Sequence, residues 1–365
     1  MKAPHRILVT GAAGAPALNY VRSLRQAPEP FHLIGVDCSA FHLPTAETDE
    51  RHLVPRADDP DYISVLNDIA RESGAELIFA QPDAEIRVLS GRREELAAPT
   101  LLPRKETVER CLDKFASYSA WRAAGIKVPG TRRLDTPRNL SGAFREFGEL
   151  WLRPACGAAG NGSYRTADTR HARMWLDTHD GWGSYTAAEY LSPDSVTWQS
   201  VWMDGQLVVA QGRRRLEWEF ADRTPTGITG VTGVGMTIRD EDVDAVAMAA
   251  VRAVDDNPHG IFSVDMTYDA AGVPNPTEIN IGRFFTTSLF FSAAGLNMPY
   301  IFTRLALGEE PPAIERKLNP LPPGLLWVRG MDRAPQLVRA EDVESAAQEL
   351  TARRSRASAG RATAA

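Results

Sequence analysis

The stretch Gly260 to Phe284 reads GIFSVDMTYDAAGVPNPTEINIGRF. From Phe262 to Tyr268, apolar side chains alternate with polar ones, which is typical of a strand with one buried face. Residues 269–276 are rich in Gly, Pro and Asn and therefore predict a reversal of the chain. The alternation returns over residues 277–281, so we expect an antiparallel hairpin.

Three oxygen-bearing side chains fall on one face of this predicted hairpin. Glu278 and Asn280 share a face because alternate residues of a strand point the same way. If the two strands pair, Asp265 lies beside them. Carboxylate and amide oxygens suit Mg²⁺ that is held together with nucleotide phosphates. The pattern alone also fits a hairpin with a solvated face and no metal.

Composition and charge limit the class of protein. A chain of 365 residues, 43% hydrophobic and 24% charged, has room for two or three globular units. A formal net charge of −6 argues against binding to nucleic-acid phosphates. Neither a membrane-spanning stretch nor a signal-peptide pattern is visible. We therefore expect a soluble cytoplasmic protein without a nucleic-acid or membrane partner.

The N-terminal residues resemble the start of a dinucleotide-binding unit. A β-rich run, Arg6 to Thr10, enters a turn at Gly11 to Gly14, a helical pattern follows, and a second β-rich run ends at Asp37. Ala17 occupies the place of the third glycine of the fingerprint, and no tyrosine has a lysine four residues later. These departures favour a structural Rossmann-like unit without a cofactor over a nicotinamide-binding one.

The rest of the N-terminal region continues the alternation of strands and helices. An amphipathic helix is predicted over residues 62–73 and a buried strand over Leu77 to Ala80, which together indicate a parallel sheet. Ligands of such sheets bind beyond the carboxyl ends of the strands. Three polar residues stand at one such end and either contact a small substrate or cap the next helix: Gln81, Asp83 and Glu85.

A boundary is expected near Pro99 to Lys105, and one helix ending at Gly125 is expected after it. The apolar stripe of that helix comprises Val108, Leu112, Phe115 and Tyr118. Lys114 lies on the other side, where a lysine is either solvated or able to meet phosphate.

The middle of the chain holds a glycine-rich loop and a hinge pattern. A strand-like run, Leu150 to Arg153, enters the sequence PACGAAGNG at residues 154–162. Glycines let backbone N–H groups surround an anion, so this loop is either a phosphate flap or an ordinary turn. Residues Glu189 to Leu191 precede a Ser-Pro-Asp break and read as a hinge or as a simple strand end.

Two further patterns follow the predicted hinge. Arg213 and Arg215 share one face of a strand, and Arg214 opposes them. Helices are predicted over residues 240–254 and 298–307. The cysteines are too few and too widely separated for a disulfide framework or a zinc site: Cys38, Cys111 and Cys156.

Taken in order, these motifs resemble the ATP-grasp superfamily, in particular the ATP-binding half of carbamoyl-phosphate synthase, over about residues 5 to 312. The resemblance implies an α/β fold, with an N-terminal Rossmann-like pre-ATP-grasp domain followed by a two-lobed α+β ATP-grasp domain. The implied segments are 1–103 for the first domain, 104–187 for the small lobe, 188–340 for the C-terminal lobe, and 341–365 for a C-terminal helix and a disordered basic tail.

The resemblance also implies roles for particular residues. Lys114 and Arg153 would contact the phosphates of ATP, and Arg283, with Arg153, would stabilise the transferring phosphoryl group. The remaining implied roles are a flap containing Gly157, Gly160 and Gly162, adenine recognition at Glu189, Tyr190 and Leu191, ribose contact at Asp194, and Mg²⁺ binding by Asp265, Glu278 and Asn280.

Two positions depart from the pattern of the superfamily. Asp194 is the only acid in the region after the hinge, where a ribose-binding Glu is usual. The usual Glu-x-Asn-x-Arg has become Glu278-x-Asn-x-Gly-Arg283, which displaces the arginine by one residue.

The implied activity is that of an ATP-dependent ligase that joins a small carboxylic acid to an amine through an acyl phosphate and releases ADP. The implied partners are these small substrates, and a homodimer stays open. Two alternatives remain at this point: an ATP-binding regulatory protein without turnover, and a ligase whose acceptor is a carrier-protein thiol.

Overall fold

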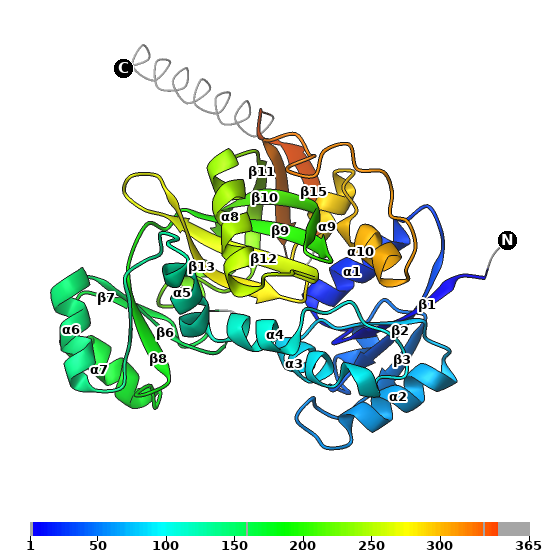
Figure 1. The fold of residues 1–365 in the computed structure, drawn as a ribbon, viewed down its shortest axis with the longest axis horizontal. Coiled ribbons are helices and arrows are strands. Elements are labelled where there is room, and N and C mark those ends of the chain that lie inside the picture. Colours follow the sequence, from blue (N-terminus) through cyan, green and yellow to red (C-terminus); the bar gives the residue numbers. More distant parts are fainter. Residues whose placement is uncertain (1–2, 158–159, 331–332, 342–365) are drawn as a thin grey trace, which may run out of the picture.

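The computed structural model describes residues 3–157, 160–330 and 333–341. Its strands form three sheets, one of seven strands and two of four. In Figure 1 the N-terminal sheet lies at the lower right, the small middle sheet at the left, and the large sheet above and between them.

The N-terminal sheet is parallel, with the order β3-β2-β1-β4. Apolar side chains of its strands, such as Leu8 and Ile34, are completely buried, as expected of a sheet covered on both faces. The predicted Rossmann-like unit is therefore confirmed as a fold. Its elements are β1 (His5–Thr10), α1 (Ala15–Arg25), β2 (Phe31–Asp37), β3 (Glu50–Leu53), α2 (Tyr62–Glu72), β4 (Leu77–Phe79) and α3 (Asp83–Gly91), with short 3₁₀ turns at Leu43–Thr45 and Arg93–Glu95.

The single helix expected before Gly125 is wrong, because the structure has two helices there. α4 (Lys105–Leu112) is followed by Asp113, and α5 (Lys114–Ala123) begins directly after that residue. Asp113 is extended, and its carboxylate accepts hydrogen bonds from the backbone N–H groups of Phe115 and Ala116. Such an N-cap starts a new helix, so Lys114 becomes the first residue of α5.

The small sheet is antiparallel, with the order β5-β8-β6-β7, and α6 and α7 cover one of its faces (Figure 1). Alternation along β6 turns Leu150 and Leu152 toward the helices and Trp151 and Arg153 away from them. The elements are β5 (Thr131–Arg133), α6 (Pro137–Phe147), β6 (Leu150–Pro154), β7 (Tyr164–Thr166), α7 (Thr169–Thr178) and β8 (Tyr185–Glu189).

The large sheet is also antiparallel, with the order β13-β12-β9-β10-β11-β14-β15. α8 packs on one of its faces, while α9 and α10 lie between the sheet and α1 of the N-terminal region (Figure 1). Its elements are β9 (Ser195–Met203), β10 (Gln206–Trp218), a 3₁₀ turn (Ala221–Arg223), β11 (Thr232–Ile238), α8 (Glu241–Val254), β12 (Gly260–Tyr268), β13 (Pro274–Ile281), α9 (Leu289–Ala293), α10 (Met298–Ala306), β14 (Leu325–Gly330) and β15 (Arg333–Arg339).

The predicted hairpin is confirmed as β12 and β13, in which Asp265 pairs with Glu278. The segment boundaries inferred from the sequence stay predictions, and β8 continues through Glu189, beyond the boundary at 187. The predicted C-terminal helix and tail lie, apart from Glu341, outside the described residues. Within the described part of the chain, no helix combines the length and the apolar composition that a bilayer span requires.

Candidate active site

A cavity of about 750 Å³ lies between the small sheet and the polar face of the large sheet. Most of the residues singled out from the sequence line this central cavity: Lys114, Arg153, Gly157, Gly160, Glu189, Tyr190, Leu191, Asp265, Glu278, Asn280 and Arg283. Gly162 and Asp194 are not in its lining. The cavity therefore joins segments that are far apart in sequence.

The hairpin formed by β12 and β13, the central hairpin, turns its carboxylates toward the cavity. Asp265 and Glu278 are paired across β12 and β13, and the Nδ2 of Asn280 donates to Asp265 Oδ2 at 3.1 Å. Two carboxylates and one amide are hard oxygen ligands of the kind that Mg²⁺ prefers. This set is too small to enclose the ion alone, which fits a Mg²⁺ whose remaining ligands are phosphate oxygens and water.

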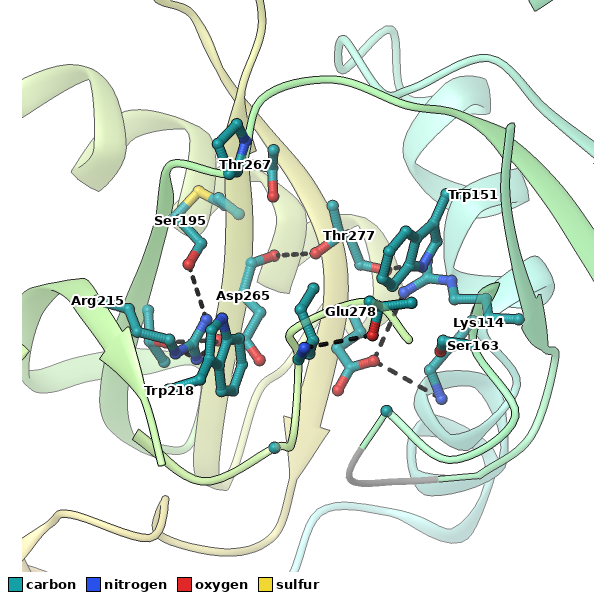
Figure 2. Close-up of a pocket in the computed structure, with 18 of the residues that line it drawn as sticks. Lys114, Trp151, Ser163, Ser195, Arg215, Trp218, Asp265, Thr267, Thr277 and Glu278 are labelled. Carbon is teal, nitrogen blue, oxygen red and sulfur yellow. Dashed lines mark hydrogen bonds and ion pairs between the residues drawn. The ribbon is translucent and has the colours of Figure 1, made fainter. Parts of the chain in front are cut away.

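Two cations reach the Glu278 carboxylate from the other side of the cavity (Figure 2). Lys114 Nζ and Arg153 Nη1 each lie 3.6 Å from Glu278 Oε2. Burial on its own raises the pKa of Glu278, but the charges of nearby cations outweigh it and hold that pKa below its usual value; these are Lys114, Arg153, Arg283 and Arg215. Glu278 is therefore ionised at neutral pH and available as a ligand.

The two cations are themselves fixed by the backbone. Lys114 Nζ donates to the carbonyl of Gly157, at the start of the glycine-rich loop. Arg153 Nη2 donates to the carbonyl of Thr277 at 2.7 Å, while its buried Nε has no partner among the described residues. A buried donor without a partner is unfavourable, so Arg153 retains capacity for an anion in the cavity.

The glycine-rich loop adopts conformations that require glycine. Gly160 and Gly162 have φ angles of 67° and 71°, in the left-handed region. A Cβ on Gly162 would lie 2.4 Å from the hydroxyl of Tyr185, and the Gly162 carbonyl accepts a hydrogen bond from the Trp175 indole. Of the predicted flap, residues 158 and 159 lie outside the described residues.

The hinge enters the cavity at the end of β8. The N–H of Glu189 donates to the carbonyl of Gly130 at 2.7 Å, and the N–H of Tyr190 to that of Glu149 at 3.3 Å. The N–H of Leu191 has no hydrogen-bond acceptor within the described part of the chain. Leu191 is therefore the hinge residue whose backbone N–H is free to meet a ligand.

Asp194 is placed differently from the other expected site residues. Its carboxylate points to Arg214, 3.3 Å away, on the side of β10 that turns from the cavity. Ribose contact by Asp194 thus finds no support in this geometry. The same ion pair confirms that Arg214 opposes Arg213 and Arg215, which both line the cavity.

This chain is similar to a known domain family in sequence and to known proteins in structure. Residues 7–101 match the PylC-like N-terminal domain family. The structure also resembles N5-carboxyaminoimidazole synthase from Aspergillus clavatus in complex with ADP and 5-aminoimidazole ribonucleotide. The TM-score is 0.67 at 14% identity, and the match covers 89% of this chain and 81% of that one. The chain has the ATP-grasp fold.

Two further solved structures share this ATP-grasp fold. Biotin carboxylase from Campylobacter jejuni, in a β,γ-ATP complex, has a TM-score of 0.67 and 15% identity, and the match covers 90% of this chain and 76% of that one. L-amino acid ligase from Bacillus licheniformis has a TM-score of 0.63 and 14% identity, with coverage of 90% and 79%. No curated protein matches the sequence.

Several residues that line the cavity had no predicted role. Arg215 Nη1 donates to Ser195 at 2.9 Å, its Nη2 lies 3.5 Å from Asp265, and its guanidinium stacks 3.8 Å from the ring centre of Trp218 (Figure 2). Arg213 lies deeper in the same strand. The alternation in the sequence placed both arginines on one face but gave no reason to connect that face with the central hairpin.

The N-terminal region also contributes to the site. Arg283 Nε donates to Asp83 at 2.6 Å, and Arg283 Nη2 donates to Asn280 Oδ1 at 2.7 Å. Gln81 Nε2 donates to the carbonyl of Phe284 at 3.0 Å. None of Gln81, Asp83 and Glu85 lines the cavity or caps α3, so neither alternative raised from the sequence describes them. Gln81 and Asp83 instead hold the end of the central hairpin.

Proposed function

We propose that this protein is an ATP-dependent carboxylate–amine ligase that forms an acyl phosphate and releases ADP and phosphate. The observation that carries the proposal is the convergence of Lys114 and Arg153 on the Glu278 carboxylate, beside Asp265, inside the central cavity. Cations and oxygen ligands on opposite sides of one space suit a nucleotide triphosphate with its metal.

ATP would lie along the cavity from the hinge to the hairpin. The free N–H of Leu191 would donate to the adenine edge, and Lys114, Arg153 and the backbone of the glycine-rich loop would hold the phosphates. Asp265, Glu278 and Asn280 would hold Mg²⁺, which when bound neutralises phosphate charge and orients the γ-phosphate.

Catalysis by this site would rest on positioning and electrostatics. In phosphoryl transfer the transferring group carries dispersed negative charge, and fixed cations around it lower the barrier. Arg153 and Arg283 are such cations. Arg153 is held by the Thr277 carbonyl, and Arg283 is held by Asp83 and Asn280, so both guanidinium groups are fixed at the cavity. Closure of the glycine-rich loop would keep water from a labile acyl phosphate.

A covalent enzyme intermediate is not part of the proposal. Cys156 is the thiol beside the cavity, at the entrance to the glycine-rich loop, and burial together with the Asp113 carboxylate raises its pKa. A raised pKa reduces the thiolate that a nucleophilic cysteine needs.

The relatives support an ATP-dependent ligation without naming the substrates. Solved structures with this fold include complexes with ATP and with ADP, and one is an L-amino acid ligase. We therefore propose a small carboxylic acid of the amino-acid class as the first substrate and an amine as the acceptor.

The test is release of ADP and phosphate with Mg²⁺ and ATP across a panel of carboxylic acids, each paired with a panel of amines and with a carrier-protein thiol. We expect ADP release to depend on one acid and on an amine. AMP and pyrophosphate as products would contradict the acyl-phosphate chemistry. Turnover only with the thiol would contradict the amine acceptor, and ATP binding without turnover on any pair would favour a regulatory protein.

A further inference from the structure

Arg213 is a buried cation in the central cavity that lacks a carboxylate partner. The other cations there each face one: Lys114 and Arg153 face Glu278, Arg215 faces Asp265, and Arg283 faces Asp83. Arg213 is 2% exposed, and no carboxylate lies within ion-pair distance of it in the part of the chain that the structure describes.

The hydrogen bonds of Arg213 go to hydroxyl groups. Nη1 donates to Thr287 Oγ1 at 2.6 Å and Nη2 donates to Thr197 Oγ1 at 3.1 Å, while the buried Nε has no partner among the described atoms. Burial, and secondarily the charge of Arg215, lower the pKa of Arg213 to about 9, which leaves it charged at neutral pH. The Thr197 hydroxyl that accepts from Arg213 donates in turn to Asp265, whose charge acts on the guanidinium without touching it. A buried cation without a direct ionic partner is unfavourable, so this arrangement suits an anionic ligand.

The register of the large sheet places Arg213 relative to the proposed metal site. Arg213 of β10 pairs with Thr197 of β9, Thr197 pairs with Asp265 of β12, and Asp265 pairs with Glu278 of β13. Residues that are paired across neighbouring strands point to the same face. These four residues therefore form one row, with Arg213 at one end and Glu278 at the other.

The cations near the two ends of this row lie on different sides of the proposed metal ligands. Lys114 and Arg153 reach Glu278 from the small sheet and the segment before it, on the side of the glycine-rich loop. Arg213 lies beyond Asp265, on the side away from that loop, so the proposed metal ligands stand between the two sets of cations. A phosphate held at Lys114 and Arg153 leaves the Arg213 end for a second anion.

The surroundings of Arg213 suit a small carboxylate. Its guanidinium stacks 4.5 Å from the ring centre of Phe285, and Phe285 and Thr286 line the adjoining wall. Arg283 is less available, because its Nε and Nη2 already donate to Asp83 and Asn280.

We infer that Arg213, positioned by Thr197 and Thr287, binds the substrate carboxylate whose oxygen attacks the γ-phosphate of ATP. The inference rests on the proposed function and adds the acid subsite to it. In this step a carboxylate oxygen forms a bond to the γ-phosphorus, the bond from that phosphorus to the β,γ-bridging oxygen breaks, and ADP leaves with the electron pair. No proton is transferred.

The test compares R213M with wild type, using the acid and amine that give the highest wild-type turnover. We expect the KM for the acid to rise about 100-fold, as for loss of a buried charged contact, while the Kd of a non-hydrolysable ATP analogue without acid stays within about twofold. R214M is the control, because Arg214 faces away from the cavity, and both constants should stay at wild-type values. A lower affinity for the ATP analogue with an unchanged KM for the acid would assign Arg213 to phosphate and overturn the inference.

A second variant tests the inference even if R213M fails to fold. T287V removes one hydroxyl that holds the guanidinium, and the KM for the acid should rise about tenfold with the affinity for the ATP analogue unchanged. An unchanged KM in T287V, with R213M unfolded or unaffected, would overturn the inference. Absence of acid-dependent ADP release from wild type would instead overturn the proposed function, so the two failures are distinct.

Discussion

Lys114 Nζ and Glu278 Oε2 lie 3.6 Å apart, although Lys114 begins α5 and Glu278 belongs to the central hairpin of the large sheet. The separation is too long for a hydrogen bond, so the two groups attract by charge. The ammonium donates one N–H to the Gly157 carbonyl and keeps its other N–H groups for a phosphate. Arg153 Nη1 also lies 3.6 Å from Glu278 Oε2.

Replacement of Glu278 by Gln should abolish turnover. The change removes the negative charge that offsets four nearby cations and removes a proposed metal ligand, so ADP release should fall at least about 100-fold. The matched control is Asp269→Asn on the same hairpin, whose carboxylate pairs with Lys127 away from the cavity and whose loss should leave turnover unchanged. A Glu278→Gln protein with normal turnover would remove this carboxylate from the mechanism.

The ion pair between Asp83 and Arg283 should contribute to stability. Asp83→Ala leaves the Arg283 side chain, 15% exposed, without its carboxylate, and the free energy of unfolding in urea should fall by about 2 kcal/mol. Asp58→Ala is the control, because the ion pair of Asp58 and Arg56 is exposed, with side-chain exposures of 76% and 78%. This substitution should change the free energy of unfolding by no more than about 0.5 kcal/mol. Equal effects of the two substitutions would show that Asp83 does not anchor the hairpin.

Glu85 should make stability depend on pH. Burial raises its pKa from 4.5 to about 7, so between these values the folded protein holds a proton that the unfolded chain has released. The free energy of unfolding therefore falls as pH rises through this window, by up to about 3 kcal/mol.

Glu85→Gln stays neutral and should lose this dependence. The free energy of unfolding of Glu85→Gln in urea, minus that of wild type, should be larger at pH 8 than at pH 5. The exposed Glu94→Gln serves as the control. The same difference between Glu85→Gln and wild type at both pH values would show that Glu85 is ionised throughout.

Much of the fold was predictable from local patterns. The alternation of polar and apolar residues, with a turn rich in Gly, Pro and Asn, predicted the central hairpin. The same alternation predicted that Asp265 and Glu278 are neighbours. The edge strand β3 was not predicted, since its sequence Glu-Arg-His-Leu has no apolar alternation. The break at Asp113 was missed because a continuous apolar stripe outweighed the capping aspartate that divides it.

The site was predictable only at residues that belong to motifs of the superfamily that the sequence resembles. Lys114, Arg153 and the hairpin residues belong to recognisable motifs, and the structure gathers them in one cavity. The positions of Arg213 and Asp83 depend on strand order and on packing of the N-terminal region against the hairpin. No spacing along the chain encodes those relationships.

Gly162→Ala should weaken nucleotide binding. Its φ of 71° strains any other residue by about 1–2 kcal/mol, and the new Cβ would meet the Tyr185 hydroxyl at 2.4 Å, so the glycine-rich loop must shift. The Kd of a non-hydrolysable ATP analogue should rise about tenfold, and Tyr185→Phe in the same chain should restore part of the loss.

The control for this loop is Gly148→Ala. Gly148 has a similar φ of 75°, but no atom lies within 4 Å of its would-be Cβ, and it lies outside the lining of the cavity. The Kd of the ATP analogue should therefore stay at the wild-type value. Wild-type affinity in Gly162→Ala would show that the shape of this loop does not matter for the nucleotide.

The fate of the carboxylate oxygen tests the acyl phosphate most directly. The substrate acid, labelled with ¹⁸O in its carboxylate, is turned over with Mg²⁺, ATP and the amine, and the phosphate released is analysed by mass spectrometry. Attack by the carboxylate on the γ-phosphate predicts ADP and phosphate that carries one ¹⁸O atom from the acid. Unlabelled phosphate, or ¹⁸O in AMP with release of pyrophosphate, would contradict the account.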